Sequence, residues 1–348
     1  MLRSLSLRNF RNFEAADFDL GGSSTVFLSA NGRGKTSLLE AIYFISTLRS
    51  FRTSKVREMK RIGSRGFEIT LEILRREDWK SELRIEDFSE RHLFVDDQPV
   101  KRASEFANKF KCVAFLPDDP VIVTGSPVLR RRFLDMFICM LDRDYFLALQ
   151  KYASALKNRN FLLKSGHPDR SLLNAYGALL AESGSVIVNR RIQILKILEE
   201  KTKLLLAEIR PEIAEFKLVS RHSAETLDRQ KFQEKLEKTL EKDLERYATL
   251  TGPHVDDFDL LANGKALRFY GSRGQCRIVS LALKLAEFEL VSESREKVVV
   301  LVDDAVADLD RKARESFLSK TQNAGQVFYA FTELPDDEVF RSSRVVNL

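Results

Sequence analysis

The chain has 348 residues, of which 44% are hydrophobic, so it is long enough to bury the core of one large domain or two ordinary ones. Its three cysteines form no CxxC pair and leave one over, a pattern that indicates neither a disulfide framework nor a zinc site. The net charge of +6 favours polyanions, although solvated charged faces give the same composition. No run approaches the roughly 18 apolar residues that span a bilayer, so we expect a cytoplasmic protein that contacts no membrane.

Short strands are predicted at the start of the chain. Polar and apolar residues alternate in two stretches before residue 21, and residues 25–28 are β-branched and apolar. From residue 36 to 48 apolar residues recur at helical spacing, so the third strand leads through a glycine-bearing turn directly into a helix. Two further strands are predicted at 67–73, where the alternation is strict, and at 111–115.

The composition changes after Pro127. From residue 128 to about 247, glycine and proline are sparse, and apolar residues recur at helical spacing among Lys, Arg and Glu. Strand-like and helical segments alternate again from residue 258 onward. A β-rich start and end that bracket helices predict one α/β head built from both chain termini, residues 1–126 and 248–348, with a helical lever domain at 127–247 inserted into it.

A phosphate-binding loop of the Walker A type lies between the third predicted strand and the helix. Its glycines allow backbone N–H groups to curl around phosphate oxygens, and the following helix N-terminus adds the positive end of its dipole. Lys35 is expected to reach the β- and γ-phosphates of ATP, and Thr36 to hold Mg²⁺. A chance glycine-rich turn is the alternative. The predicted nucleotide-binding residues are Ser29, Ala30, Asn31, Gly32, Arg33, Gly34, Lys35 and Thr36.

An apolar run at residues 298–302 ends in two carboxylates, as in a Walker B motif. A strand in the middle of a sheet would deliver Asp303 to the Mg²⁺ ion, and Asp304, the predicted catalytic residue, would orient or polarise the attacking water. Strands followed by acids are common in α/β proteins, so this pattern by itself is weak. Its pairing with the Walker A loop makes it strong.

A third motif, residues 271–277, opens the last long helix and resembles the signature motif of ABC-type ATPases. A serine and glycine backbone at a helix N-terminus makes a second anion site, for which the candidates are Ser272, Gly274 and Gln275. An ordinary capped helix is the alternative. The order of the motifs, with the signature ahead of Asp303, is that of ABC heads, and residues 307–310 occupy the place of the D-loop.

Several longer stretches lie at residues 9–14, 31–42, 49–53, 124–127 with 130–135, and 251–254 with 256–257. Together they resemble the RecF family of bacterial recombinational-repair proteins. Their joint order, interleaved with the Walker and signature motifs, favours this family over a transporter ATPase.

The resemblance implies an ABC/SMC-type P-loop ATPase head with a short helical lever. It also implies an ATP-dependent head-to-tail homodimer, in which ATP and Mg²⁺ held by the Walker motifs of one copy meet the signature of the other. Members of the family bind double-stranded DNA near single-strand gaps and, with RecO and RecR, help RecA to load there. Weak, DNA-stimulated ATP hydrolysis would then serve release.

Three residues depart from the family pattern. They are Ser29 in the Walker A loop, Val255 after a histidine, and Ala307 in the D-loop. The first and last leave open a scaffold that binds nucleotide without hydrolysing it. Another SMC-like or ABC-type ATPase that acts on protein or RNA is the other alternative.

Two further interpretations also stay open. His254 is either a catalytic base or a loop histidine bonded to backbone. The basic residues after the Walker helix are candidates for contacts with DNA phosphates, although solvated-loop charge is equally compatible with them. These residues are Arg49, Arg52, Lys55 and Arg57.

Overall fold

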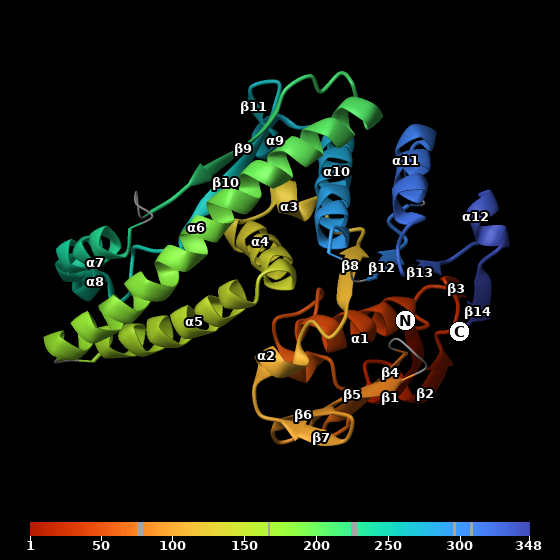
Figure 1. Ribbon diagram of the computed structural model, residues 1–348, viewed down its shortest axis with the longest axis horizontal. Helices are drawn as coiled ribbons and strands as arrows, with labels where there is room; N and C mark the ends of the chain where they lie inside the picture. Colours follow the sequence, from red (N-terminus) through yellow and green to blue (C-terminus); the bar gives the residue numbers. More distant parts are fainter. Residues whose placement is uncertain (75–78, 166–167, 224–227, 295–296, 307–308) are drawn as a thin grey trace. The chain divides into compact units, whose positions relative to one another are not determined.

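The computed structural model describes residues 1–74, 79–165, 168–223, 228–294, 297–306 and 309–348, which form two compact units (Figure 1). Unit 1 consists of Met1–Asp118 and Glu287–Leu348, and unit 2 of Asp119–Ala286. Both chain termini therefore belong to unit 1. The bounds differ from those of the predicted domains, most at the second boundary, because residues 248–286 cluster with the helices of unit 2.

A six-stranded antiparallel sheet forms one layer of unit 1, in the order β2-β1-β4-β5-β6-β7. Buried and half-buried residues alternate strictly along β4, which is typical of a sheet with one face on the core. The strands are β1 (Leu2–Phe10), β2 (Phe13–Asp19), β4 (Phe67–Leu74), β5 (Lys80–Asp87), β6 (Arg91–Val95) and β7 (Gln98–Val100).

A five-stranded parallel sheet forms a second layer, in the order β14-β3-β13-β12-β8. Every residue of β12 and β13 is buried, as expected for central strands covered on both faces. The strands are β3 (Ser24–Leu28), β8 (Lys111–Phe115), β12 (Val298–Asp303), β13 (Gln326–Phe331) and β14 (Arg344–Asn347). The predicted strands at 25–28 and 111–115 are thus confirmed, and both belong to this sheet.

Helix α1 (Lys35–Thr47) lies between the two sheets, where it contacts β4 and β5 on one side and β8, β12 and β13 on the other. On the opposite side of the parallel sheet lies α11 (Arg311–Thr321), whose Phe317 packs edge-on against Phe115 of β8, with ring centroids 4.9 Å apart (Figure 1). Three short helices, η1 (Val56–Glu58), α2 (Ala103–Phe106) and α12 (Glu338–Arg341), complete unit 1.

Unit 2 is built on the 40-residue helix α6 (Arg170–Ile209), which packs against α5 (Arg143–Leu163), α7 (Arg229–Lys238) and β9 (Phe216–Arg221). Strand β9 interrupts the predicted helical arm and pairs with β10 (Asp257–Ala262), which in turn pairs with β11 (Lys265–Ala266). The remaining helices are α3 (Val121–Thr124), α4 (Pro127–Leu141), α8 (Leu240–Arg246), α9 (Leu267–Tyr270) and the start of α10 (Arg273–Ser292).

Within the described parts of the chain, α6 is the one helix long and apolar enough to cross a membrane, with a mean hydropathy of 1.2 over its most apolar window. Half of that window is buried inside the protein. The buried residues face α5, α7 and β9, so packing within unit 2 accounts for the apolar composition of this helix.

Buried ion pairs join elements of unit 2 that are far apart in the sequence. Arg159 of α5 donates to Asp243 of α8 at 2.7 Å and to the hydroxyl of Thr249 at 2.6 Å, and both charged side chains are at most 2% exposed. Burial of a charge is costly unless a partner compensates it, so each side chain depends on the other.

We expect Arg159→Ala to lower the free energy of unfolding by about 3 to 5 kcal/mol, because it leaves the Asp243 carboxylate buried and unpaired. The exposed pair Arg170–Glu241, 2.8 Å apart and also between the arm helices, is the matched control, since its side chains are 63% and 69% exposed. Arg170→Ala should cost less than about 1 kcal/mol. Urea denaturation followed by circular dichroism measures both, and equal losses would show that burial does not decide the strength of these pairs.

Candidate functional site

The predicted Walker A loop connects β3 to α1 at the carboxyl edge of the parallel sheet. Gly32 and Gly34 have φ angles of +81° and +111°, a region that L side chains rarely adopt. Gly34 is also the N-cap of α1, and the side-chain amide of Asn12 donates to the carbonyl of Arg33 at 3.1 Å. The loop is therefore curled into an anion-binding shape and pinned to the turn between β1 and β2.

Lys35 is the first residue of α1 and is only 5% exposed. Its ammonium group donates to the loop carbonyls of Ser29 and, at 3.3 Å, Ala30, so the cation already lies over the loop. Ser29 does not have a positive φ, and its hydroxyl donates to the carbonyl of neighbouring Ala30 at 3.3 Å. The backbone at this position does not require glycine, which is the physical reason the loop tolerates the serine.

Asp303 is the last residue of the buried strand β12, and Asp304 follows it directly. Asp303 is 5% exposed and accepts a hydrogen bond from Thr36. Burial raises the pKa of Asp303, with the neighbouring Asp304 adding to the increase, while the Thr36 hydroxyl and the Lys35 cation oppose it. The structure thus brings a hydroxyl and a carboxylate together, and oxygen donors of this kind suit Mg²⁺.

Asp304 has a φ of +48°, and its N–H donates to the carbonyl of Ala330 on β13 at 3.0 Å. Strained backbone of this kind persists only where the surroundings enforce it, and it is common at functional sites. Here it places Asp304 in the lining of the same cavity as Lys35 and Thr36, which has a volume of about 660 Å³. Ala307, the departure in the D-loop, lies outside the described residues.

The predicted signature motif is the exposed start of α10 in unit 2. The Ser272 hydroxyl accepts from the N–H of Gln275 at 3.2 Å, and the Gln275 side chain accepts from the N–H of Ser272 at 2.9 Å. This reciprocal pair is a capping box. Ser272, Gly274 and Gln275 are all solvent-exposed, so the helix start is both well ordered by its cap and open to an anion.

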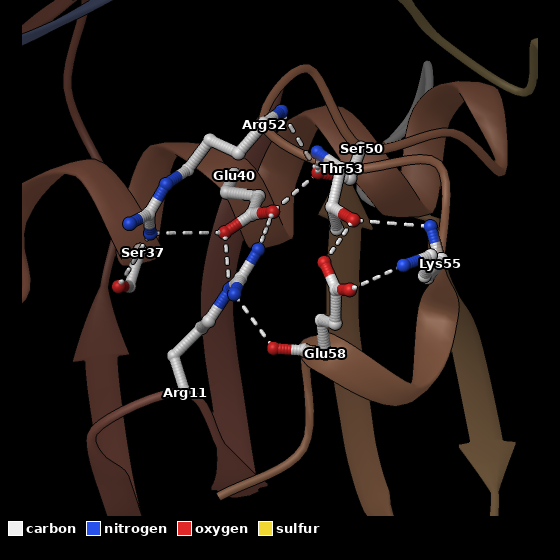
Figure 2. A network of polar contacts seen from close by, with 8 residues as sticks. All are labelled: Arg11, Ser37, Glu40, Ser50, Arg52, Thr53, Lys55 and Glu58. Carbon is white, nitrogen blue, oxygen red and sulfur yellow. Dashed lines mark hydrogen bonds and ion pairs between the residues drawn. The ribbon is translucent and has the colours of Figure 1, made fainter.

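A buried carboxylate that was absent from the sequence-based candidates lies beside the Walker A loop. Glu40 of α1 is fully buried and accepts two hydrogen bonds from Arg11, at 2.6 and 2.7 Å, and one from the Ser50 hydroxyl (Figure 2). A second cation, Arg52, approaches it at 3.4 Å. These residues come from three separate stretches that resemble the RecF family, and that coincidence was the signal available in the sequence.

The basic side chains after α1 are less available for contacts with DNA than the composition of this segment indicates. Arg52 bonds to Glu40 and Ser37 and lines the cavity, and Lys55 pairs with Glu58 at 3.5 Å (Figure 2). Arg52 therefore lies where nucleotide is expected to bind, although it was a candidate for contacts with DNA.

The structure distinguishes the two interpretations of His254. Its Nδ1 lies 2.6 Å from the Tyr152 hydroxyl and its Nε2 lies 2.8 Å from the carbonyl of Thr249. Because a carbonyl only accepts, Nε2 donates to Thr249 and Nδ1 accepts from Tyr152. Burial lowers the pKa of His254, which favours this neutral form. His254 is thus a loop histidine with both ring nitrogens occupied.

Comparisons with known proteins identify the family. The family model described as the RecF/RecN/SMC N terminal domain matches residues 1–333. The DNA replication and repair proteins RecF of Lachnoclostridium phytofermentans and Leptospira interrogans are 34% and 33% identical to the chain, over 91% and 96% of its length and 89% and 92% of theirs. The chain belongs to the RecF family.

Solved structures agree with membership of the RecF family. Two structures of the recombination mediator protein RecF in the RecFOR pathway, described as RecF-ATPrS and RecF-ATP, match with TM-scores of 0.87 and 0.89 at 32% identity. Each match covers 97% of this chain, and the two matches cover 94% and 93% of the respective RecF chains. An Smc head bound to the C-winged helix domain of ScpA matches with a TM-score of 0.56 at 13% identity, over 99% of this chain and 93% of that one, which shows the fold alone. The predicted ABC/SMC-type head is confirmed.

The two loop glycines allow a matched test of the loop geometry. A Cβ at Gly34 would lie 2.5 Å from the Phe13 ring, whereas a Cβ at Gly32 would meet nothing within 4 Å. In both alanine variants the left-handed backbone should lower the free energy of unfolding by about 1 kcal/mol. We expect Gly34→Ala to cost a further 1 to 3 kcal/mol or so for the clash, measured by denaturant unfolding. Equal losses in the two variants would mean that the loop does not pack against Phe13 as described.

Proposed function

We propose that this chain is an ATP-dependent DNA-binding protein of recombinational repair, a cytoplasmic protein that dimerises when it binds ATP. The observation that carries the proposal is the cavity lined by the curled loop, Lys35, Thr36 and Asp304. A related solved structure is described as RecF-ATP, which agrees with nucleotide binding in such a cavity. The family name and the RecFOR pathway named for those relatives support a role in DNA repair.

In this proposal residues 29–36 hold the phosphates of ATP. Lys35 exchanges its bonds to two loop carbonyls for bonds to the β- and γ-phosphates, which satisfy the ammonium group better because they carry full charge. Thr36 and Asp303 would hold Mg²⁺, which would offset the negative charge of the phosphates. The raised pKa of Asp303 indicates that its buried charge is costly without a cation, which fits a metal ligand.

The signature serine is proposed to act on the nucleotide of a second copy. The Ser272 hydroxyl accepts from Gln275 through an oxygen lone pair, which leaves its proton free to donate to a γ-phosphate. The first N–H groups of α10 add to this anion site, since the start of a helix has no partners for them within the helix. ADP lacks the γ-phosphate and would not bridge the two heads.

The DNA substrate and the partner proteins are inferred from the family and not from contacts in this chain. We infer double-stranded DNA at single-strand gaps as the substrate, RecR and RecO as partners, and RecA loading as the outcome, with slow hydrolysis for release. The RecFOR pathway, in which the related RecF structures are described, supports this inference. The excess of basic residues also agrees with a polyanionic partner.

Asp304 is proposed to orient the attacking water. Asp304→Asn keeps the size of the side chain and removes its charge, so we expect ATP to stay bound while turnover falls by about 10²-fold or more. The dimer formed with ATP should persist longer than that of the unmodified protein. Phosphate release and size-exclusion chromatography measure the two effects. Turnover at the unmodified rate would assign the role to another group, and no turnover in either protein would favour a nucleotide-binding scaffold.

Ser272→Arg tests dimerisation across the signature motif. The exposed serine accepts an arginine without a clash in the monomer, and loss of the cap costs about 1 kcal/mol. We expect near-normal ATP binding, but no ATP-induced dimer and no hydrolysis, because the long side chain fills the seam between the heads. Sizing with ATP, with ADP and with neither nucleotide measures this.

Two variants control that experiment. Ser165→Arg makes the same change at another exposed serine of unit 2 and should dimerise normally. Lys35→Ala should fail one step earlier, by losing ATP binding itself. If Ser272→Arg dimerises and hydrolyses ATP as the unmodified protein does, the signature motif has a different role.

A further inference from the structure

The turn that carries Ser272 packs directly on the short helix α9. The N–H of Gly271 donates to the carbonyl of Leu267 at 2.8 Å, and the sulfur of Cys276 lies 3.8 Å from the same carbonyl. A Cβ at Gly271 would lie 2.7 Å from that carbonyl oxygen, which is too close for a side chain. A movement of α9 would therefore also move the turn at residues 271 and 272.

Apolar packing holds little of α9. This helix has four residues, and an isolated helix shorter than about 12 residues is marginal in water. Phe269 and Tyr270 are 70% and 73% exposed, whereas Leu267 is 3% exposed. The remaining residue, Arg268, has a side chain that is 23% exposed. The position of α9 thus depends on Leu267 and on what Arg268 contacts.

Arg268 lies beside two carboxylates of β10. Its Nη1 is 3.4 Å from Asp259 and 3.9 Å from Asp257, and side chains two positions apart leave a strand on the same face. The Nε of Arg268 and the Oδ1 of Asp259 are buried and have no hydrogen-bond partner within the described part of the chain. Attraction between charges at short range, and not a fork of hydrogen bonds, therefore holds Arg268 on β10.

Two other arginines hold these carboxylates. Arg130 is 1% exposed and donates to both oxygens of Asp257, at 2.8 and 2.9 Å, and Arg221 of β9 pairs with Asp259. Burial alone would raise the pKa of Asp257, but the hydrogen bonds and charge of Arg130, a backbone hydrogen bond and the charge of Arg268 together lower it. The Asp257 carboxylate therefore stays ionised in a fixed place, where it attracts Arg268.

We propose that Arg268, held by Asp257 and Asp259, is a positioning residue for the signature serine. The ion pairs keep α9 on β10, and α9 keeps the turn from which Ser272 faces a second copy. Without the charge at Arg268, Leu267 would anchor α9 with no attraction to the carboxylates. Ser272 would retain its capping box but lose its fixed direction toward the γ-phosphate. The inference rests on the proposed ATP-dependent dimer.

Hydrogen–deuterium exchange in the nucleotide-free protein tests the attachment of α9. Arg268→Met keeps a long side chain and removes its charge, so exchange at the bonded amides of Gly271 and Cys276 should rise by about 5- to 10-fold. Arg268→Lys restores the charge and should bring exchange back to within about 2-fold of the unmodified protein. Asp259→Asn removes the charge from the strand side and gives the same readout if Arg268→Met does not fold.

The matched control is Arg190→Met. Arg190 is another arginine of unit 2 in an ion pair, 2.7 Å from Asp142, and it belongs to α6 and not to α9 or β10. Its replacement removes one charge and one ion pair from the same unit. Exchange at Gly271 and Cys276 should stay within about 2-fold of that in the unmodified protein, because these amides open with α9 and not with α6.

Sedimentation with ATP measures the consequence for the dimer. Arg268→Met should weaken the ATP-induced dimer by about 10-fold or more, which is the effect of losing one hydrogen bond to a charged group. The affinity of the monomer for a fluorescent ATP analogue should stay within about 2-fold, because Arg268 belongs to unit 2 and the Walker A loop to unit 1. Arg268→Lys should restore the dimer.

The possible outcomes separate this inference from the function on which it rests. Unchanged exchange in Arg268→Met, or an equal rise in Arg190→Met, overturns the positioning role whether or not the unmodified protein dimerises. Faster exchange with an unchanged dimer also overturns it, as does a loss that Arg268→Lys does not reverse. An unmodified protein that binds ATP without dimerising overturns the proposed dimer, and the exchange data then decide the attachment of α9 alone.

Discussion

Burial of α1 between two sheets is the constraint on which the arrangement of unit 1 depends. The helix begins at the phosphate loop and is covered on both sides, so 11 of its 13 residues are buried. An amphipathic surface helix would expose its polar residues, but here Glu40 faces the interior and needs cationic partners. The pairing of Glu40 with Arg11 and Arg52 follows from that burial, and it ties the loop, the end of β1 and the segment after α1 to one another.

The parallel sheet explains why the Walker residues meet. Strand β13 lies between β3 and β12, and all three run in the same direction, so the loop after β3 and the carboxylates after β12 leave the sheet at the same edge. The hydrogen bond from Asp304 to Ala330 on the intervening strand holds the second carboxylate at that edge. A strongly apolar central strand thereby delivers acidic groups to a polar cavity without exposing its own backbone.

In unit 2, buried ion pairs hold a loop against two helices. Arg130 donates to both oxygens of Asp257 at 2.8 and 2.9 Å, and Arg191 donates to Asp135 at 2.7 Å and to the carbonyl of Pro253 at 2.7 Å. These bonds join α4 and α6 to the start of β10. Buried pairs of this kind add little net stability compared with apolar packing, but they penalise other arrangements, because each one displaced would leave a charge unpaired. We interpret them as fixing the conformation of the loop before β10.

Local patterns in the sequence determined the elements and the phosphate loop. Alternation at 67–73, the apolar run before Asp303 and the glycines of the loop each depend on residues close together in the chain, and the structure has the strands and the loop where these patterns predict them. Strand β9 was missed because its alternation is short and it lies among helices, so only its pairing with β10 makes it a strand.

Only the tertiary structure decided which polar residues are neighbours. The fully buried charge of Glu40, the bond from Arg52 to it and the occupied nitrogens of His254 all depend on partners 5 to 102 positions away in the chain. A sequence lists the charges that a protein must accommodate, but burial decides which of them need a partner. Burial is a property of the folded sheets and helices together, so the network around Glu40 emerged only from the fold.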